Sequence, residues 1–262
     1  MTHTARLEGL RVAVTGGTSG LGLALLRLLQ AHGAKLAFVA RDTVRVQRVV
    51  ADLPGAHGIA GDIAAKTETH RIALQINAAL GGLDVLVNNA SSLGPVPLAL
   101  LADTDCEELE RALATNLVGP FRLTKALLGS LAAAARDAAP QRPGALVVNI
   151  VSDAAVTPYA GWGAYGASKA ALAQLSRIWD DELREHGVRV LAFDPGDMDT
   201  PLHALALPDA DPAGLKRPAD AARELAALIA ETLGPARPAA FGRGDPRPAE
   251  TPPSEPPARV PS

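Results

Sequence analysis

Tyr165 and Lys169 are the pair of residues whose types and spacing point most directly to chemistry. They lie four positions apart, so in a helix both side chains project from one face, one turn apart. A phenol with an ordinary pKa of about 10 is a weak base near neutral pH, and a nearby ammonium group favours its phenolate form. The spacing therefore predicts a tyrosine that exchanges a proton with a bound molecule and is assisted by the lysine.

A glycine-rich segment near the N-terminus has the residue types of a phosphate-binding turn. It lies between a predicted strand over 11–14 and a predicted helix over 21–30. Glycine lets the backbone approach an anion closely, and the helix that follows directs free N–H groups at it. We expect this turn to hold a dinucleotide pyrophosphate, with candidate contacts from Gly16, Thr18, Ser19, Gly20, Leu21 and Gly22.

These groups need a scaffold, and short apolar runs alternate with longer helical patterns along most of the chain. This alternation predicts βα units wound around a parallel sheet. The predicted strands cover 11–14, 35–39, 57–60, 84–90, 145–152 and 188–193. The predicted helices cover 21–30, 45–53, 67–80, 107–136 with an irregularity at Gly119-Pro120, 163–186 and 218–233. Residues 194–214 are predicted to form a long loop or lid.

Length and composition set the broad class of the protein. The 262 residues are 48% hydrophobic and 20% charged, which suits one domain over 1–242. Nine of the 21 prolines lie in 234–262, so 243–262 is expected to be a disordered tail. The net charge of −3 and the lack of a long apolar run argue against nucleic-acid and membrane partners, and we expect a cytoplasmic protein. Cys106 has no neighbouring ligands typical of a metal site, so no metal is expected.

Several motifs in order resemble the short-chain dehydrogenase/reductase family. They are Thr15-Gly-x-x-x-Gly-x-Gly22, Asn88-Asn89-Ala90, Ser152 thirteen positions before Tyr165-x-x-x-Lys169, and Asp194-Pro195-Gly196. The resemblance runs from Leu10 to Leu233. It implies a Rossmann-type doubly wound α/β sheet with helices on both faces, and a homodimer or homotetramer. Ser91 stands where the family has a glycine after Asn-Asn-Ala.

The resemblance also implies roles for individual residues. Ser152 would hydrogen-bond the substrate oxygen, Tyr165 would give or take its proton, and Lys169 would hold the nicotinamide ribose. Asn116 would help to hold a water molecule in the proton relay. Tyr165 and Lys169 would also contact the cofactor, and further contacts would come from Asp62, Ile63, Asn89, Ala90, Pro195, Gly196 and Thr200.

The end of the second predicted strand bears on which dinucleotide binds. NAD-dependent members of the family have an acidic residue where this chain has Ala40, and Arg41 beside it offers a planar cation that suits a 2'-phosphate. NADP(H) is therefore favoured over NAD(H). An inward turn of Asp42 toward the ribose is the open alternative, and Ser19 stands where many NADP-dependent members have a second basic residue.

The implied activity is the interconversion of a small carbonyl compound and an alcohol, and reduction of an imine or enone stays open. A pocket is expected from 91–97, 153–159, Trp162 and 198–207, with Trp162 either stacking on a substrate or packing a loop. His203 is expected to be exposed rather than catalytic. Two other classes remain: a non-catalytic NADP(H)-binding regulator, and an interaction protein that recruits partners through its proline-rich tail.

Overall fold

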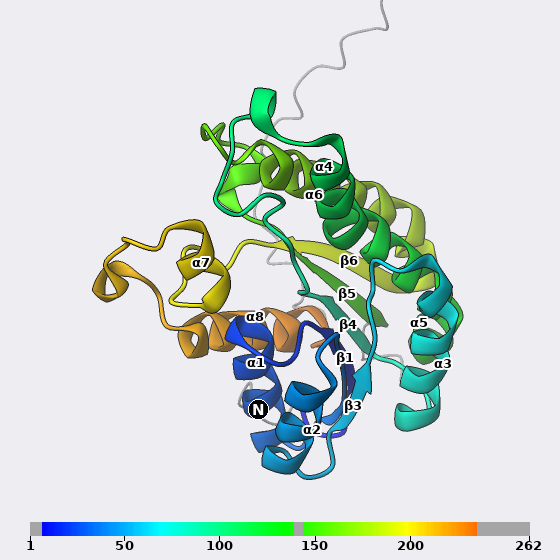
Figure 1. Cartoon of the computed structure of the whole chain (residues 1–262). Helices are drawn as coiled ribbons and strands as arrows, with labels where there is room; N and C mark the ends of the chain where they lie inside the picture. Colours follow the sequence, from blue (N-terminus) through cyan, green and yellow to red (C-terminus); the bar gives the residue numbers. More distant parts are fainter. Residues whose placement is uncertain (1–6, 139–143, 235–262) are drawn as a thin grey trace, which may run out of the picture.

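A computed structural model of the protein describes residues 7–138 and 144–234, and a parallel sheet forms the centre of this part (Figure 1). The strands run in the order β3-β2-β1-β4-β5-β6, and each neighbouring pair is parallel. Their bounds are β1 Arg11–Thr15, β2 Lys35–Ala40, β3 His57–Ala60, β4 Val85–Asn88, β5 Ala145–Ile150 and β6 Val188–Phe193. The chain starts in the middle, winds outward to β3 and then returns beside β1, so the predicted doubly wound α/β class and single domain are confirmed.

Alternating side chains of the strands divide the core into two layers. In β1, Val12 and Val14 pack into one apolar cluster and Ala13 into the other, because successive side chains of a strand point to opposite faces. The first cluster joins the sheet to α1 Gly20–Ala31, α2 Thr43–Asp52 and α8 Pro218–Thr232. The second joins it to α3 Thr69–Leu80, α5 Gly119–Asp137 and α6 Gly163–Leu183. Figure 1 shows these helices on both sides of the sheet.

The long helix predicted over 107–136 is interrupted. The structure has α4 over Cys106–Leu113, a π-helical turn over Ala114–Val118, and then α5. Pro120 has no N–H to donate to the carbonyl of Asn116 four positions earlier, so a regular helix cannot continue through this region. The predicted irregularity at Gly119-Pro120 therefore lies one turn earlier than expected, and it contains Asn116.

The segment predicted as a loop over 194–214 contains a short helix, so that prediction was incomplete. Helix α7 covers Pro201–Ala206, with Thr200 as its N-cap and Pro201 in its first turn. The Thr200 hydroxyl accepts a hydrogen bond from the His203 backbone N–H at 3.2 Å. An N-cap threonine followed by proline is a helix-start signal, but the helix is too short to show a hydrophobic period.

Two further sequence predictions concern the C-terminal tail and the membrane. The predicted disordered tail over 243–262 lies outside the described residues. Within the described residues, no helix is both long and apolar enough to cross a membrane.

Candidate functional site

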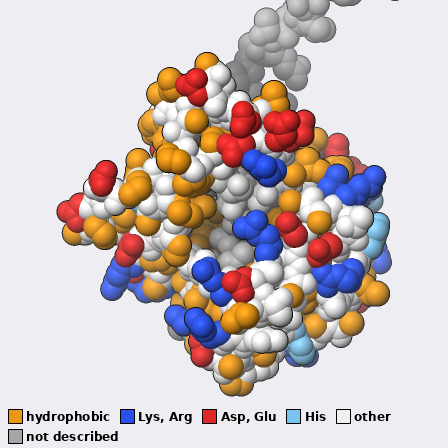
Figure 2. Space-filling model, viewed as in Figure 1, with side chains coloured by type: hydrophobic (Ala, Val, Ile, Leu, Met, Phe, Trp, Pro, Cys, Tyr) orange, Lys and Arg blue, Asp and Glu red, His pale blue; other side chains and the backbone are white. Residues whose placement is uncertain are grey.

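A cleft of about 610 Å³ lies at the carboxyl ends of the strands. Residues that follow each strand line it, including Gly16 after β1, Ala90 after β4 and Ser152 after β5. Strand order reverses between β1 and β4, and ligands of open parallel sheets bind at such a reversal. Figure 2 shows a hollow on this face with Lys and Arg side chains around it.

The glycine-rich turn forms the wall of the cleft beside β1 and α1. Gly16 and Gly20 have positive φ angles of 72° and 50°, which glycine adopts without strain. Within the described chain, the Ser19 side chain makes no capping hydrogen bond to α1, so the N-terminus of this helix faces the cleft without a side-chain cap. This arrangement suits an anion held by backbone N–H groups.

Gly22 has a packing role instead of lining the cleft. A Cβ atom at this position would collide with the carbonyl oxygen of Gly16 and would lie 2.7 Å from Nδ2 of Asn89. The glycine therefore lets α1 pack closely against the turn and against the exit of β4.

Two cations lie beyond the end of β2, Arg41 directly after the strand and Arg45 in the first turn of α2, and the sequence indicated only the first. Arg41 and Arg45 both line the cleft. Between them, Asp42 caps α2 by accepting a hydrogen bond from the Arg45 backbone N–H at 3.0 Å, and it pairs with the Arg45 guanidinium at 3.4 Å. The Asp42 carboxylate is thereby engaged at the helix start, which weighs against its inward turn toward a ribose.

The exit of β4 is tied to the glycine-rich turn through Thr15. The Thr15 hydroxyl accepts hydrogen bonds from the backbone N–H groups of Asn89 and Ala90, both at 3.0 Å. The Asn89 side chain donates to the carbonyl oxygens of Thr15 at 2.9 Å and Gly16 at 3.2 Å. The two loops that meet at the strand-order reversal are therefore held in fixed relation to each other.

Tyr165 and Lys169 lie near the start of α6 and both face the cleft. The Lys169 Nζ atom lies 5.4 Å from the centroid of the Tyr165 ring and donates a 2.7 Å hydrogen bond to the carbonyl oxygen of Ile150. Burial raises the pKa of Tyr165 to about 12, although hydrogen bonding to Ser152 and Ser91 opposes this rise. Burial also lowers the pKa of Lys169 to about 8, while the negative charge of Asp194 acts in the opposite direction.

This electrostatic balance corrects one expectation from the sequence. The lysine was expected to favour the phenolate form of the tyrosine, but in the structure Tyr165 holds its proton more tightly than an ordinary phenol. The physical reason is desolvation, which penalises both the phenolate and the ammonium in the same buried site. Spacing along the helix revealed the pairing and could not reveal the depth of burial.

Asn116 lies behind the cleft wall, fully buried, and joins three segments. Its Oδ1 atom accepts hydrogen bonds from the Ser91 hydroxyl at 3.2 Å and the Ser92 backbone N–H at 2.8 Å. Its Nδ2 atom donates to the Ser92 carbonyl at 2.7 Å and the Ser168 hydroxyl at 2.8 Å. The Ser168 hydroxyl in turn donates to the carbonyl of Tyr165 at 2.6 Å. The Asn116 side chain is thus linked to the tyrosine by Ser168.

The segment after β6 covers the tyrosine from the other side of the cleft. Leu202 and Ala206 of α7 pack in one apolar cluster with Leu93, Trp162 and Tyr165. The Trp162 ring also meets the Tyr165 ring edge-on, with centroids 5.6 Å apart. Trp162 lines the cleft and also packs in this cluster. Its position is therefore compatible both with stacking on a substrate and with packing a loop, the two roles expected from the sequence.

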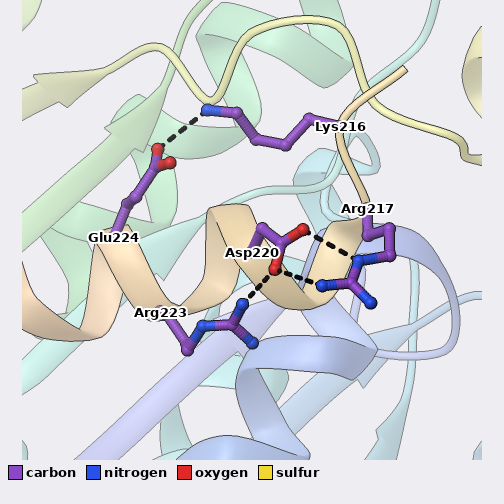
Figure 3. Close-up of polar contacts among 5 residues, drawn as sticks. All are labelled: Lys216, Arg217, Asp220, Arg223 and Glu224. Atoms are coloured by element: carbon purple, nitrogen blue, oxygen red, sulfur yellow. Dashed lines mark hydrogen bonds and ion pairs between the residues drawn. The ribbon is translucent and has the colours of Figure 1, made fainter. Parts of the chain in front are cut away.

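The chain leaves α7 and returns to α8 through a segment with several polar ties. Lys216 donates its backbone N–H to the Asp197 carbonyl at 2.9 Å, and its ammonium pairs with Glu224 at 2.8 Å. Arg217 and Arg223 both pair with Asp220 at the start of α8 (Figure 3). The two ends of the segment that carries α7 are therefore joined to each other by Lys216 and Asp197, and its second end is tied to α8 through Glu224.

Most residues expected at the site from the sequence meet in this cleft. Those that line it are Gly16, Thr18, Ser19, Gly20, Leu21, Arg41, Asp62, Ile63, Asn89, Ala90, Ser152, Tyr165, Lys169, Pro195, Gly196 and Thr200. Gly22 and Asn116 are not among the lining residues and act from behind it. Arg45 and Thr15 were missed. Thr15 stands inside a recognised motif, whereas no local pattern distinguishes Arg45 from other arginines of α2.

Comparisons with known proteins agree with this geometry. A family model described as short chain dehydrogenase matches residues 11–210. Momilactone A synthase from Oryza sativa subsp. japonica is 35% identical over 210 residues, covering 77% of this chain and 71% of that protein.

Solved structures show the same fold. A 3-ketoacyl-(acyl-carrier-protein) reductase from Brucella melitensis, complexed with NADH, has a TM-score of 0.77 at 27% identity and covers 85% of this chain and 91% of its own. A short chain dehydrogenase from Burkholderia cenocepacia J2315, in complex with NADP, has a TM-score of 0.75 at 28% identity, covering 88% and 92%.

Proposed function

Because this chain belongs to the short-chain dehydrogenase/reductase family, we propose that it is an NADP(H)-dependent oxidoreductase that interconverts a carbonyl compound and the corresponding alcohol. One observation carries the proposal: the glycine-rich turn, two arginines and Tyr165 line the same cleft. One end of the cleft suits a dinucleotide, and the other presents an acid/base group. Hydride transfer coupled to proton transfer requires both.

The residues present fit a nicotinamide dinucleotide. At the turn, a Cβ on Gly20 would lie 3.1 Å from Cγ2 of Thr200, so glycine keeps open the space between the start of α1 and the segment after β6. The uncapped start of α1 would hold the pyrophosphate, and Asn89 and Ala90 would border the nicotinamide half. When bound, the nicotinamide supplies or accepts the hydride.

The preference for NADP(H) rests on the end of β2. Arg41 and Arg45 place two guanidinium groups along the cleft where an adenosine ribose would lie. Ala40 offers no side-chain acceptor for ribose hydroxyls, and the Asp42 carboxylate is engaged by Arg45. A 2'-phosphate would therefore find cations here, whereas a free 2'-hydroxyl would lack a carboxylate partner.

Tyr165 would transfer the proton. Its high pKa keeps the phenol protonated near neutral pH, so it is ready to donate to the oxygen of a carbonyl substrate during reduction. Ser152, at the exit of β5, lies close enough to hydrogen-bond with Tyr165 and would hold the same substrate oxygen. In alcohol oxidation Tyr165 would have to be a phenolate before it could take up the proton, and its high pKa keeps that form scarce near neutral pH unless the bound cofactor changes its surroundings.

Lys169 and Asn116 would assist Tyr165 without exchanging the proton with the substrate themselves. The Lys169 ammonium is anchored on the Ile150 carbonyl and faces the cleft one turn beyond Tyr165, where it would reach the nicotinamide ribose. Asn116 would position the tyrosine through Ser168, and its place in a π-helical turn fixes its side chain between the loop after β4 and α6.

The competing function is a regulator that binds NADP(H) without turnover. Fluorescence titration with NADPH and NADH, followed by NADPH oxidation with a panel of ketones and aldehydes, separates the two. We expect tighter binding of NADPH, turnover of at least one carbonyl compound, and a loss of turnover of about a hundredfold or more in Tyr165→Phe. NADPH affinity should stay within about twofold in this variant, because the phenol oxygen is only one of the many contacts expected with the dinucleotide.

Tight NADPH binding without turnover of any carbonyl compound would favour the regulator. Equal turnover by wild type and Tyr165→Phe would contradict the assignment of the acid/base group. Tighter binding of NADH than of NADPH would contradict the interpretation of Arg41 and Arg45 while leaving the fold unaffected.

A further inference from the structure

Asp153 follows Ser152 in the chain and is fixed beside it in the cleft. Its Oδ1 atom accepts a hydrogen bond from the Ser152 hydroxyl at 2.9 Å, and its Oδ2 atom accepts one from the Tyr159 hydroxyl at 2.7 Å. All three residues line the cleft. Ser152 and Tyr159 therefore fix the position of the Asp153 carboxylate. The carboxylate lies one hydrogen-bond length from Ser152, the residue that would contact the substrate.

This arrangement makes the region beside Tyr165 rich in hydrogen-bond acceptors. A serine hydroxyl has one proton, which Ser152 directs to Asp153 in this structure. When that proton turns to a substrate oxygen, Oδ1 of Asp153 loses this donor and can accept a hydrogen bond from a neighbouring group of the substrate. The hydrogen bond from Tyr159 lowers the pKa of Asp153 below its ordinary value, against the smaller effect of burial, and so favours the carboxylate. Each carboxylate oxygen has two acceptor sites, so Asp153 retains capacity for a further donor.

Charges along the cleft differ between its two ends. At the glycine-rich end its lining mixes the cations Arg41 and Arg45 with the carboxylates Asp42 and Asp62, whereas the carboxylates Asp153, Asp194 and Asp197 line the end near Tyr165. The basic residues at that second end, among those described, are the buried Lys169, which is bonded to the Ile150 carbonyl, and His203 on α7. An anionic substrate group beside Ser152 would thus meet carboxylates and few accessible cations.

The remaining walls of this end are apolar. Leu93 and Trp162 face α7, which contributes Leu202 and Ala206 to the same cluster around Tyr165. An apolar substrate body would pack against these side chains and gain the usual free energy of apolar burial. The apolar walls and the Asp153 carboxylate together suit a ligand with an apolar body and one hydrogen-bond donor.

We propose that this cleft selects alcohols and ketones with an apolar body and an ammonium or hydroxyl group on the carbon next to the reacting one, and that Asp153 accepts a hydrogen bond from that group. Substituents on adjacent carbons lie about one hydrogen-bond length apart, which matches the spacing of Ser152 Oγ and Asp153 Oδ1. The ammonium compound gains most, because its charge is opposite to that of Asp153. This inference rests on the proposed function, because it uses the same cleft and the same reacting oxygen.

A matched series of alcohols tests the proposal. The series is 1-phenylethanol, 1-phenylethane-1,2-diol, 2-amino-1-phenylethanol and mandelate, which share the phenyl group and the reacting alcohol and differ in the neighbouring substituent. Oxidation of each would be followed by NADPH formation in wild type, in Asp153→Asn and in Asp209→Asn. Asp209 is an exposed carboxylate in the segment between α7 and α8, and it does not line the cleft. Its variant therefore controls for the loss of one negative charge.

In wild type we expect kcat/KM to be highest for the amino alcohol, intermediate for the diol, lower for 1-phenylethanol and lowest for mandelate. Asp153→Asn should reduce the preference for the amino alcohol over 1-phenylethanol by about tenfold and should improve mandelate relative to the others. Asparagine retains an oxygen that can accept from Ser152, so this variant removes the charge with little change of shape. Asp209→Asn should keep the wild-type order.

Other outcomes separate failure of this inference from failure of the proposed function. Turnover with equal kcat/KM for all four alcohols, or an order unchanged in Asp153→Asn, would overturn the role of Asp153 and leave the oxidoreductase function in place. If none of the four is oxidised, calorimetric titration of the amino alcohol and mandelate into the NADPH-saturated protein decides the inference. Tighter binding of the amino alcohol that disappears in Asp153→Asn supports it, and equal or undetectable binding overturns it.

Discussion

Lys169 is anchored through its Nζ atom to the backbone carbonyl oxygen of Ile150, the last residue of β5, at 2.7 Å. The ammonium group is fully buried among residues that supply little other compensation, and its pKa is lowered to about 8 by that burial. This contact joins the start of α6 to the end of β5, which lies beside the edge strand β6. It also means that protonation of Lys169 opposes folding.

Replacement of Lys169 by methionine should change how stability depends on pH. The folded protein releases this proton near pH 8, whereas the unfolded chain keeps it to its ordinary value of 10.5. Between these values the unfolded state binds more protons, so raising the pH favours the folded state. From about pH 7.5 to 9.5, wild type should gain roughly 2 kcal/mol of unfolding free energy relative to Lys169→Met. Denaturant unfolding at several pH values measures this, and parallel curves for the two proteins would contradict it.

Ser91 should tune the acid/base behaviour of Tyr165. Its hydroxyl contacts Asn116 at 3.2 Å and also hydrogen-bonds with Tyr165, which lowers the pKa of that phenol. Ser91→Gly removes this effect, so the tyrosine should hold its proton to higher pH. The rise of kcat/KM for alcohol oxidation should then begin at higher pH than in wild type. Ser91→Thr keeps a hydroxyl and should restore the profile, whereas a purely structural role would lower activity without moving it.

Arg41 and Arg45 should both contribute to discrimination between the two dinucleotides. Replacing either with serine removes a cation near the expected 2'-phosphate, and the Kd for NADPH should rise by roughly three- to tenfold. The Kd for NADH should change by less than about twofold, because it lacks that phosphate. Arg48→Ser is the matched control, since Arg48 lies on the same helix and does not line the cleft. An equal loss for both dinucleotides would indicate a general electrostatic effect.

Gly22 should tolerate no side chain, in contrast to Gly129. A Cβ at Gly22 would collide with the Gly16 carbonyl, so Gly22→Ala should destabilise the protein by roughly 1–3 kcal/mol and weaken dinucleotide binding. A Cβ at Gly129, which is exposed in the middle of α5, meets nothing within 4 Å. Gly129→Ala should therefore stabilise the protein by roughly 0.5–1 kcal/mol. Thermal unfolding and NADPH titration measure both effects, and similar behaviour of the two variants would contradict the packing role of Gly22.

Much of this protein follows from short stretches of its sequence. The strands and most helices were predictable because hydrophobic periodicity and glycine stops act over a few residues, as at Gly81, which ends α3 in a left-handed conformation. The pairing of Tyr165 with Lys169 was equally local, since helical geometry alone places residues four apart on one face. The glycine-rich turn was recognisable because its backbone needs glycine at set positions between a strand and a helix.

Other features depended on contacts between distant segments. The order of the strands brings Ser91, Asn116 and Ser168 together although the chain separates them widely, and burial there decides the pKa values of Tyr165 and Lys169. Arg45 joins Arg41 at the cleft only because α2 packs at the end of β2. The sequence by itself determined the local elements and the residue types at the site, because near neighbours control them. Tertiary structure alone decided which of those residues meet and how far water is excluded from them, because both depend on packing across the sheet.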